Sequence, residues 1–125
     1  MSLRSQVLKV VALAAVVLVP VVARADVDGS KGVVASVSVN EPSADDYSAE
    51  RGNVTINEGS TTRKYQWGGT ACNGRNLSET SIILLIQALQ NKDRLEIVPS
   101  YKSGAGQARC LVGFRIQAIA PAPAN

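Results

Sequence analysis

One apolar segment in the second half of the chain, residues 78–91, constrains the fold more than any other part of the sequence. Its large aliphatic side chains recur at the i, i+3, i+4, i+7 spacing, which places them on one face of an α-helix. The positions concerned are Ile82, Leu85, Ile86 and Leu89. Because a helix with such a stripe buries it against another element, we expect one helix seated on a β-sheet.

Two features of this helix leave alternatives open. At its start, Asn76 and Glu79 form a pair like a capping box, while Ser78 is a rival cap. Its middle is apolar on nearly every side, which is more than one sheet face usually covers. We therefore expect Ile83 or Leu84 to contact a partner, as in self-association to a homo-oligomer, unless a long loop folds over this face.

The segments on both sides of the helix alternate between apolar and polar residues, with the period of a half-buried β-strand. Three such segments precede the helix and two follow it. A turn at residues 58–60 joins the second and third, and a glycine-bearing connection joins the last two, so each pair forms a hairpin. Pro99 is expected to end the fourth strand. The predicted strands span residues 31–40, 51–57, 61–67, 94–98 and 109–117.

This order of elements predicts a β-rich α+β domain. Three strands, a helix and two strands are the succession of a five-stranded Greek-key barrel, the oligonucleotide/oligosaccharide-binding (OB) fold, in which the helix lies between strands three and four. A curled antiparallel sheet with the helix across one face would use the same elements. Both architectures stay open at this point.

The first 25 residues have the pattern of a cleavable export signal. Two basic residues precede an apolar run over residues 10–22, which is shorter than the ~20 residues that a membrane-spanning helix needs. Small residues at Ala23 and Ala25 fit a signal peptidase, so we expect cleavage after Ala25. An uncleaved membrane anchor is the alternative. The mature protein is then one domain, residues 26–125, periplasmic or secreted, with its core at 31–117 and a flexible tail at 118–125.

Cleavage changes the charge of the chain. Residues 1–25 contain Arg4, Lys9 and Arg24 but no acidic residue. Ten of the thirteen Lys and Arg residues remain, against ten Asp and Glu residues, so the mature chain is formally neutral. A neutral domain lacks the basic surplus that binds phosphate groups. We therefore predict no nucleic-acid partner, and no membrane contact after cleavage.

The two cysteines, Cys72 and Cys110, are predicted to form a disulfide. An exported chain with two cysteines has a single intramolecular pairing, and closing a loop of this length stabilises a fold by about 4 kcal/mol on the chain-entropy model. Two free buried thiols are the alternative. Because the chain contains no histidine to complete a ligand set, we expect no metal site and no cofactor.

No group of residues forms a catalytic pattern. Histidine, the commonest general base, is absent, and no serine has a lysine or carboxylate helper at a recognisable spacing. We therefore expect the protein not to be an enzyme. A small hydrolase is the least favoured function.

A few residues are candidates for ligand binding. Trp67 precedes two glycines and could offer a flat face on which a sugar ring stacks, or it could fill the mouth of the barrel. Tyr101, Lys102 and Gln107 lie in the last connection, which needs no core role. We expect a non-enzymatic binding module that recognises a glycan or another exported protein through its loops. The alternative is an inhibitor of a secreted enzyme that inserts residues 102–107.

From Asn76 onward the chain carries Asn76-Leu77, the apolar helix 82–89, the strand 95–98, the glycine-bearing loop 103–106 and the closing strand 111–116. In these features it resembles the B subunits of bacterial AB-type toxins, of the Shiga and pertussis types. The resemblance implies the small barrel, a ring of subunits whose helices line a central channel, and glycans bound at exposed edges and loops. The first half has no clear counterpart.

Overall fold

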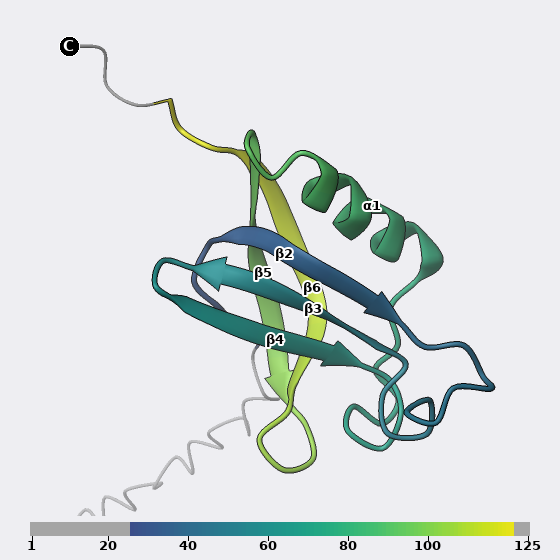
Figure 1. Ribbon diagram of the computed structural model, residues 1–125. Helices are drawn as coiled ribbons and strands as arrows, with labels where there is room; N and C mark the ends of the chain where they lie inside the picture. Colours follow the sequence, from purple (N-terminus) through teal and green to yellow (C-terminus); the bar gives the residue numbers. More distant parts are fainter. Residues whose placement is uncertain (1–25, 122–125) are drawn as a thin grey trace, which may run out of the picture.

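The computed structural model describes residues 26–121 as one β-sheet with a helix packed against it (Figure 1). Residues 1–25, where the export signal is predicted, and residues 122–125 of the predicted tail lie outside the described residues. No helix within residues 26–121 is long and apolar enough to cross a membrane. The elements are β1 (Val27–Asp28), β2 (Val33–Val39), β3 (Gly52–Glu58), β4 (Thr61–Trp67), α1 (Glu79–Gln90), β5 (Leu95–Ser103) and β6 (Arg109–Ala118).

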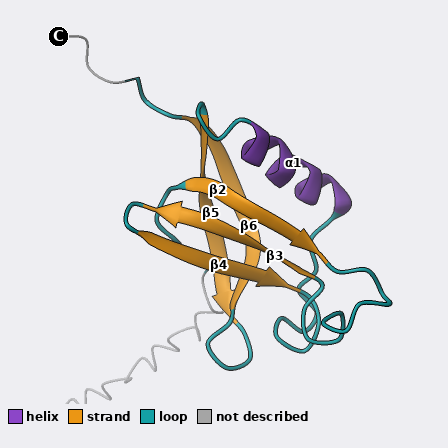
Figure 2. Ribbon diagram, in the orientation of Figure 1, coloured by secondary structure: helices purple, strands orange, loops and turns teal. Residues whose placement is uncertain are grey.

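The described strands lie in the order β1-β5-β6-β4-β3-β2. Neighbours are antiparallel except β4 and β6, which are parallel where Gln66 faces Cys110. Just before β2, Gly32 exchanges two backbone hydrogen bonds of 3.0 and 2.8 Å with Ile97 of β5, so the sheet curls until its edge meets β5. This isolated bridge does not continue as a ladder, and the sheet is not closed into a barrel. Figure 2 shows β5 and β6 crossing behind β2, β3 and β4.

The predicted β-rich domain with one helix between the third and fourth predicted strands is confirmed. The sheet is curled, as in our alternative to a barrel, but it is mixed rather than purely antiparallel. The count of five strands is wrong, because β1 adds a sixth. Val27 and Asp28 pair with Tyr101 and Ser100, and the Ser100 hydroxyl donates a 2.8 Å hydrogen bond to Asp28 Oδ1. This pairing uses backbone and polar groups, so the sequence has no alternation of apolar residues from which β1 could be predicted.

Pro99 does not end its strand, because β5 continues to Ser103. The Pro99 carbonyl accepts a 2.8 Å hydrogen bond from the backbone N–H of Gly29. The carbonyl and the nitrogen of one residue face the same side of an antiparallel strand, so the missing N–H of Pro99 also faces away from β6. The ladder with β6 therefore loses no donor, which is the arrangement that a strand tolerates for proline.

The helix α1 is capped by Ser78 and not by Asn76. The Ser78 Oγ accepts a 3.1 Å hydrogen bond from the backbone N–H of Ser81. At the other end, the Asn91 N–H donates to the carbonyl of Gln87 at 3.1 Å. The predicted helix at residues 78–91 is thus confirmed to within one residue at each end.

One face of α1 packs over β2 and β5, and the other face is open (Figure 1). Leu85 and Ala88 are fully buried, with Ile82 and Leu89 packed at the margin of the core. Ile86, predicted on the buried face, is 36% exposed. Ala88 takes the inward position, because a small side chain lets the helix approach the sheet closely.

The core lies inside the curl of the sheet and beneath α1. It contains the two largest buried side chains of the described residues, Tyr65 and Trp67, which alternate inward along β4. Trp67 contacts the backbone of Gly52 so closely that a Cβ there would collide with its ring. Around this pair pack Val34, Val54, Ile56, Leu85, Ala88, Ile97 and Leu111.

The predicted disulfide between Cys72 and Cys110 is confirmed, with their Cα atoms 5.5 Å apart. Both cysteines are fully buried. Cys72 belongs to the segment that leads into α1, and Cys110 lies in β6 beside β4. The bond therefore fixes this segment to the line along which β4 and β6 meet.

Candidate functional site

Trp67 is not available as a platform for a sugar ring. Only 2% of its surface is exposed, and it packs within the core cluster. The open face predicted from the two following glycines is therefore wrong. The alternative, an interior position for this indole, is what the structure has.

Two of the other predicted site residues share a hollow. Tyr101 and Gln107 line a depression of about 380 Å³ together with Ser103, Gly106, Ala108 and Arg109. Lys102 does not join them, since neighbouring side chains of a strand point to opposite faces. Its ammonium lies 3.4 Å from the carboxylate of Asp26 instead.

A second depression, of about 420 Å³, adjoins the first. Its walls come from β4 on one side and from the connection between β5 and β6 on the other. The two depressions share Gln107, Ala108 and Arg109, so we treat them as one surface, the β4–β6 hollow. The second depression is lined by Thr61, Thr62, Arg63, Lys64, Gln66, Ala71, Ala105, Gln107, Ala108 and Arg109.

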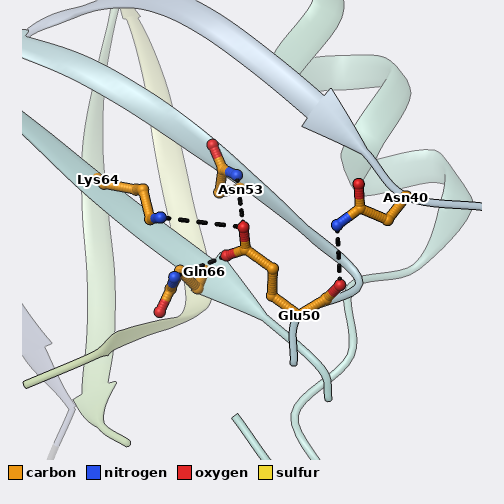
Figure 3. Close-up of polar contacts among 5 residues, drawn as sticks. All are labelled: Asn40, Glu50, Asn53, Lys64 and Gln66. Atoms are coloured by element: carbon orange, nitrogen blue, oxygen red, sulfur yellow. Dashed lines mark hydrogen bonds and ion pairs between the residues drawn. The ribbon is translucent and has the colours of Figure 1, made fainter. Parts of the chain in front are cut away.

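A partly buried carboxylate orders the β4 wall of the hollow (Figure 3). Glu50 accepts hydrogen bonds from Gln66 Nε2 at 2.6 Å and Asn53 Nδ2 at 3.1 Å, and its side chain is 15% exposed. Lys64 Nζ lies 3.9 Å from Glu50 Oε1, and Asn40 Nδ2 donates to the Glu50 carbonyl at 3.0 Å. The Gln66 oxygen points away from Glu50 and has no hydrogen bond within residues 26–121. Gln66 thus offers a fixed acceptor and Lys64 a donor at one wall.

The opposite wall is a short loop that is held at its base. Gly104 N donates to Ala108 O at 2.8 Å, Ala105 N donates to Ala71 O at 2.9 Å, and Arg75 Nη1 donates to Ser103 O at 3.0 Å. A Cβ at Gly104 would collide with Ala71 O and with a sulfur of the disulfide, so this position accepts only glycine. The amide of the exposed Gln107 is therefore carried by an anchored loop.

Arg109 stands where the two depressions meet. Its guanidinium carbon lies 5.9 Å from the centroid of the Tyr101 ring. Within residues 26–121 it takes part in no ion pair and its side chain makes no hydrogen bond. Arg63 differs, because its Nε lies 2.7 Å from Glu58 Oε2. Arg109 therefore keeps its donors available to a ligand.

Beneath Tyr101 lies a second ring. The centroids of Tyr65 and Tyr101 are 5.6 Å apart, with a tilt of 59° between the rings. The Tyr65 hydroxyl donates a 2.6 Å hydrogen bond to Glu58. Burial, followed by this hydrogen bond, raises the pKa of Tyr65 well above its usual range. Tyr65 is thus a neutral, fixed support for the half-exposed ring above it.

The β4 residues and Arg109 were not predicted as site residues. A signal for the first group exists in the sequence, since Tyr65 and Trp67 of β4 turn inward and the alternating positions must turn outward. The outward positions are Thr62, Lys64 and Gln66. No comparable signal identifies Arg109, because its role depends on the parallel contact of β6 with β4.

The chain matches no family model, no curated protein and no solved structure. The resemblance of residues 76–116 to toxin B subunits accordingly stays a prediction from sequence pattern.

Proposed function

We propose that this protein is a non-enzymatic binding module that takes a glycan in the β4–β6 hollow. The observation that carries the proposal is the combination of a part-exposed aromatic ring, Tyr101, with amide and guanidinium groups around the β4–β6 hollow. Sugar rings present an apolar face to aromatic side chains and a rim of hydroxyls to planar polar groups. Gln66, Gln107 and Arg109 supply such groups.

The arrangement of the hollow supports binding of a ligand without a large change of shape. Its β4 wall is ordered by Glu50, and its loop wall is anchored through Ala71 and the disulfide segment. Groups that are held in place before a ligand arrives lose little conformational entropy on binding. A small domain with such a surface suits recognition by contact, with no step of chemistry required.

We also propose that the protein acts outside the cytoplasm. The buried Cys72–Cys110 disulfide supports this, because structural disulfides persist in oxidising compartments. The apolar run at residues 10–22 and the small residues at Ala23 and Ala25 support export by a cleaved signal. Mass spectrometry of the protein recovered from a secreting host tests this, and a mature chain that begins at Asp26 is the expected result.

The sheet is proposed to be a variant of the OB arrangement. The order β2-β3-β4-β6-β5, the parallel contact of β4 with β6 and the helix between β4 and β5 support this. The bridge from Gly32 to Ile97 lies where a barrel of this kind would close. An experimental structure in which β2 and β5 lie apart would contradict the proposal.

The proposed glycan binding is tested with the oxidised chain 26–125 on an array of neutral and acidic glycans. We expect binding, and we expect Tyr101→Ala or Gln107→Ala to weaken it about tenfold, the effect of one lost hydrogen bond or ring contact at a binding site. Gln90→Ala, on the outer side of α1, is the matched control and should bind as the unchanged protein does. Failure of the folded protein to bind any glycan contradicts the function.

A second candidate is inhibition of a secreted enzyme by the loop between β5 and β6. The anchored base at Gly104 and the exposed tip at Gly106 and Gln107 favour it, because rigid protruding loops insert well into enzyme clefts. Recovery of an enzyme with the protein at equal stoichiometry, lost on Gln107→Ala, would support this function over glycan binding.

Self-association through α1 is a separate proposal. Ile83 is 47% exposed, and Leu84 and Ile86 are exposed beside it, on the face of α1 that points away from the sheet. Contiguous apolar side chains at a surface favour contact with another apolar surface. Light scattering should report an oligomer for the oxidised chain and a monomer for Ile83→Lys. A monomer at high concentration in both cases contradicts the proposal.

A further inference from the structure

All the charged side chains that line the β4–β6 hollow are positive. Arg63, Lys64 and Arg109 line it, whereas no Asp or Glu among residues 26–121 does. The mature chain as a whole is formally balanced, so this is a local surplus. A concave surface lined by one sign of charge favours a ligand of the opposite sign.

The three cations differ in how far they are already neutralised. Arg63 is paired with Glu58 at 2.7 Å, and Lys64 faces Glu50 at 3.9 Å. Arg109 has no carboxylate partner among the described residues. It also lines a third depression, of about 290 Å³, that adjoins the β4–β6 hollow. The uncompensated charge of the hollow therefore lies on Arg109.

The surroundings of Arg109 place its guanidinium near an aromatic ring without using its donors. Arg109 is the first residue of β6, where it pairs with Ser103 and precedes the disulfide-bonded Cys110. Its guanidinium lies over the Tyr101 ring, which rests on the buried Tyr65 ring. A planar guanidinium held on an aromatic face presents its N–H fork along its edge.

Two carboxylates in this region form no ion pair with Arg109. Asp28 lines the third depression with Arg109, and its Oδ1 accepts a 2.8 Å hydrogen bond from the Ser100 hydroxyl. Both oxygens of Glu58 are occupied, one by the Tyr65 hydroxyl at 2.6 Å and the other by Arg63 at 2.7 Å. Tyr65 is neutral at physiological pH, as a phenol with the usual pKa of about 10 already is, so it supplies no counter-charge either. The donors of Arg109 are thus open to an external acceptor.

We propose that the ligand of the β4–β6 hollow is an acidic glycan, in which the carboxylate of a uronic-acid unit binds the guanidinium of Arg109 while its ring contacts the part of Tyr101 that is left exposed. This inference rests on the proposed glycan binding and specifies its substrate class. A carboxylate matches the planar fork of arginine in a bidentate pair, and it is carried directly on the ring of such a sugar.

The test compares two ligands of the same shape and different charge. Titration calorimetry of the oxidised chain 26–125 is carried out with a trisaccharide of galacturonic acid and with its methyl ester. We expect the acid to bind about tenfold more tightly, because a hydrogen bond to a charged group is stronger than one between neutral groups. A higher salt concentration should weaken binding of the acid and leave binding of the ester unchanged.

Two substitutions at Arg109 separate charge from geometry. Arg109→Gln should lower the affinity for the acid to that for the ester, and Arg109→Lys should restore it only in part, since an ammonium keeps the charge and loses the fork. Arg115→Gln is the matched control. Arg115 lies on the same strand, bonds to Gln117 at 3.3 Å and lines no part of the hollow, so its loss should leave both affinities unchanged.

The outcomes distinguish this inference from the function on which it rests. Equal affinity for acid and ester, with Gln107→Ala still weakening both, overturns the charge preference and leaves glycan binding intact. Equal losses of affinity for the acid in Arg109→Gln and Arg115→Gln indicate attraction to the overall charge of the protein. This outcome also overturns the charge preference of the hollow. If no acidic or neutral glycan binds the folded protein, both the function and the inference fail.

Discussion

At the scale of single residues, Glu58 explains how a charge is kept inside the curl of the sheet. Its side chain is only 4% exposed, yet each oxygen has a partner, Tyr65 on one side and Arg63 on the other. A carboxylate withdrawn from water is stable only when its oxygens are paired. The pairing also ties the turn between β3 and β4 to the ring that supports Tyr101.

The Tyr65 hydroxyl should make stability depend on alkaline pH. The pKa of Tyr65 is raised by burial and by Glu58, so the folded protein holds the phenol proton to higher pH than the unfolded chain does. This contribution is complete below the usual pKa of about 10 and is lost as the pH rises above it. We expect Tyr65→Phe to lower the free energy of unfolding by about 1–2 kcal/mol at neutral pH, with the difference shrinking above pH about 10.

Urea unfolding of the unchanged protein and of Tyr65→Phe across this pH range measures the effect. Tyr101→Phe is the control, because the Tyr101 hydroxyl makes no hydrogen bond within residues 26–121. It should stay within about 0.5 kcal/mol of the unchanged protein at neutral pH. If the stability difference between the unchanged protein and Tyr65→Phe is constant up to strongly alkaline pH, the role given to the buried phenol is contradicted.

At the scale of elements, the sequence predicted what its local patterns determine. Residues 61–67 of β4 and the helix were predicted to within one residue, because period-two and period-3.6 patterns lie within the segments themselves. The strand β1 and the passage of β5 through Pro99 were missed, since both depend on which backbone lies alongside. In β6, a bulge opposite Ser100 and Tyr101 shifts the alternation, so that Leu111, Phe114 and Ile116 all face the core, which simple alternation does not anticipate.

The loop between β5 and β6 should be the element most sensitive to a small change. A methyl group at Gly104 would meet Ala71 O and the Cys110 sulfur, so we expect Gly104→Ala to destabilise the fold by about 1–3 kcal/mol and to displace the loop that carries Gln107. Glycan affinity should fall with it. Gly113→Ala is the matched control, because a Cβ at Gly113 in β6 meets nothing within 4 Å.

Thermal unfolding and glycan titration of the two variants test this expectation. The melting temperature should fall for Gly104→Ala and change little for Gly113→Ala. If Gly104→Ala keeps both the stability and the affinity of the unchanged protein, the loop base is not the rigid support that its contacts describe.

At the scale of the whole molecule, the candidate site depends on the curl of the sheet. The outward residues of β4 and the loop with Arg109 are far apart in the sequence, and the parallel contact of Gln66 with Cys110 brings them together. Tyr101 and Gln107 could be selected from the sequence because they lie in one connection. Their combination with Gln66 could not be predicted, and the interior position of Trp67 follows from the same curl.

The disulfide should contribute a large part of the stability of this assembly. Cys72 and Cys110 are 38 positions apart, and closing a loop of that length removes unfolded-state entropy worth about 4 kcal/mol. A domain of this size has a total stability of about 5–15 kcal/mol, so the double variant Cys72→Ala/Cys110→Ala should be only marginally folded. Because Cys110 lies where β4 meets β6, the variant should also lose glycan affinity while it is still folded.

Denaturant unfolding of the double variant, beside the reduced unchanged protein, measures the loss of stability. Titration with glycan below the unfolding transition measures the loss of affinity. A loss below about 1 kcal/mol with unchanged affinity would mean that the hydrogen bonds of the Ala71 segment and the core beneath Tyr65 hold the hollow without the covalent bond.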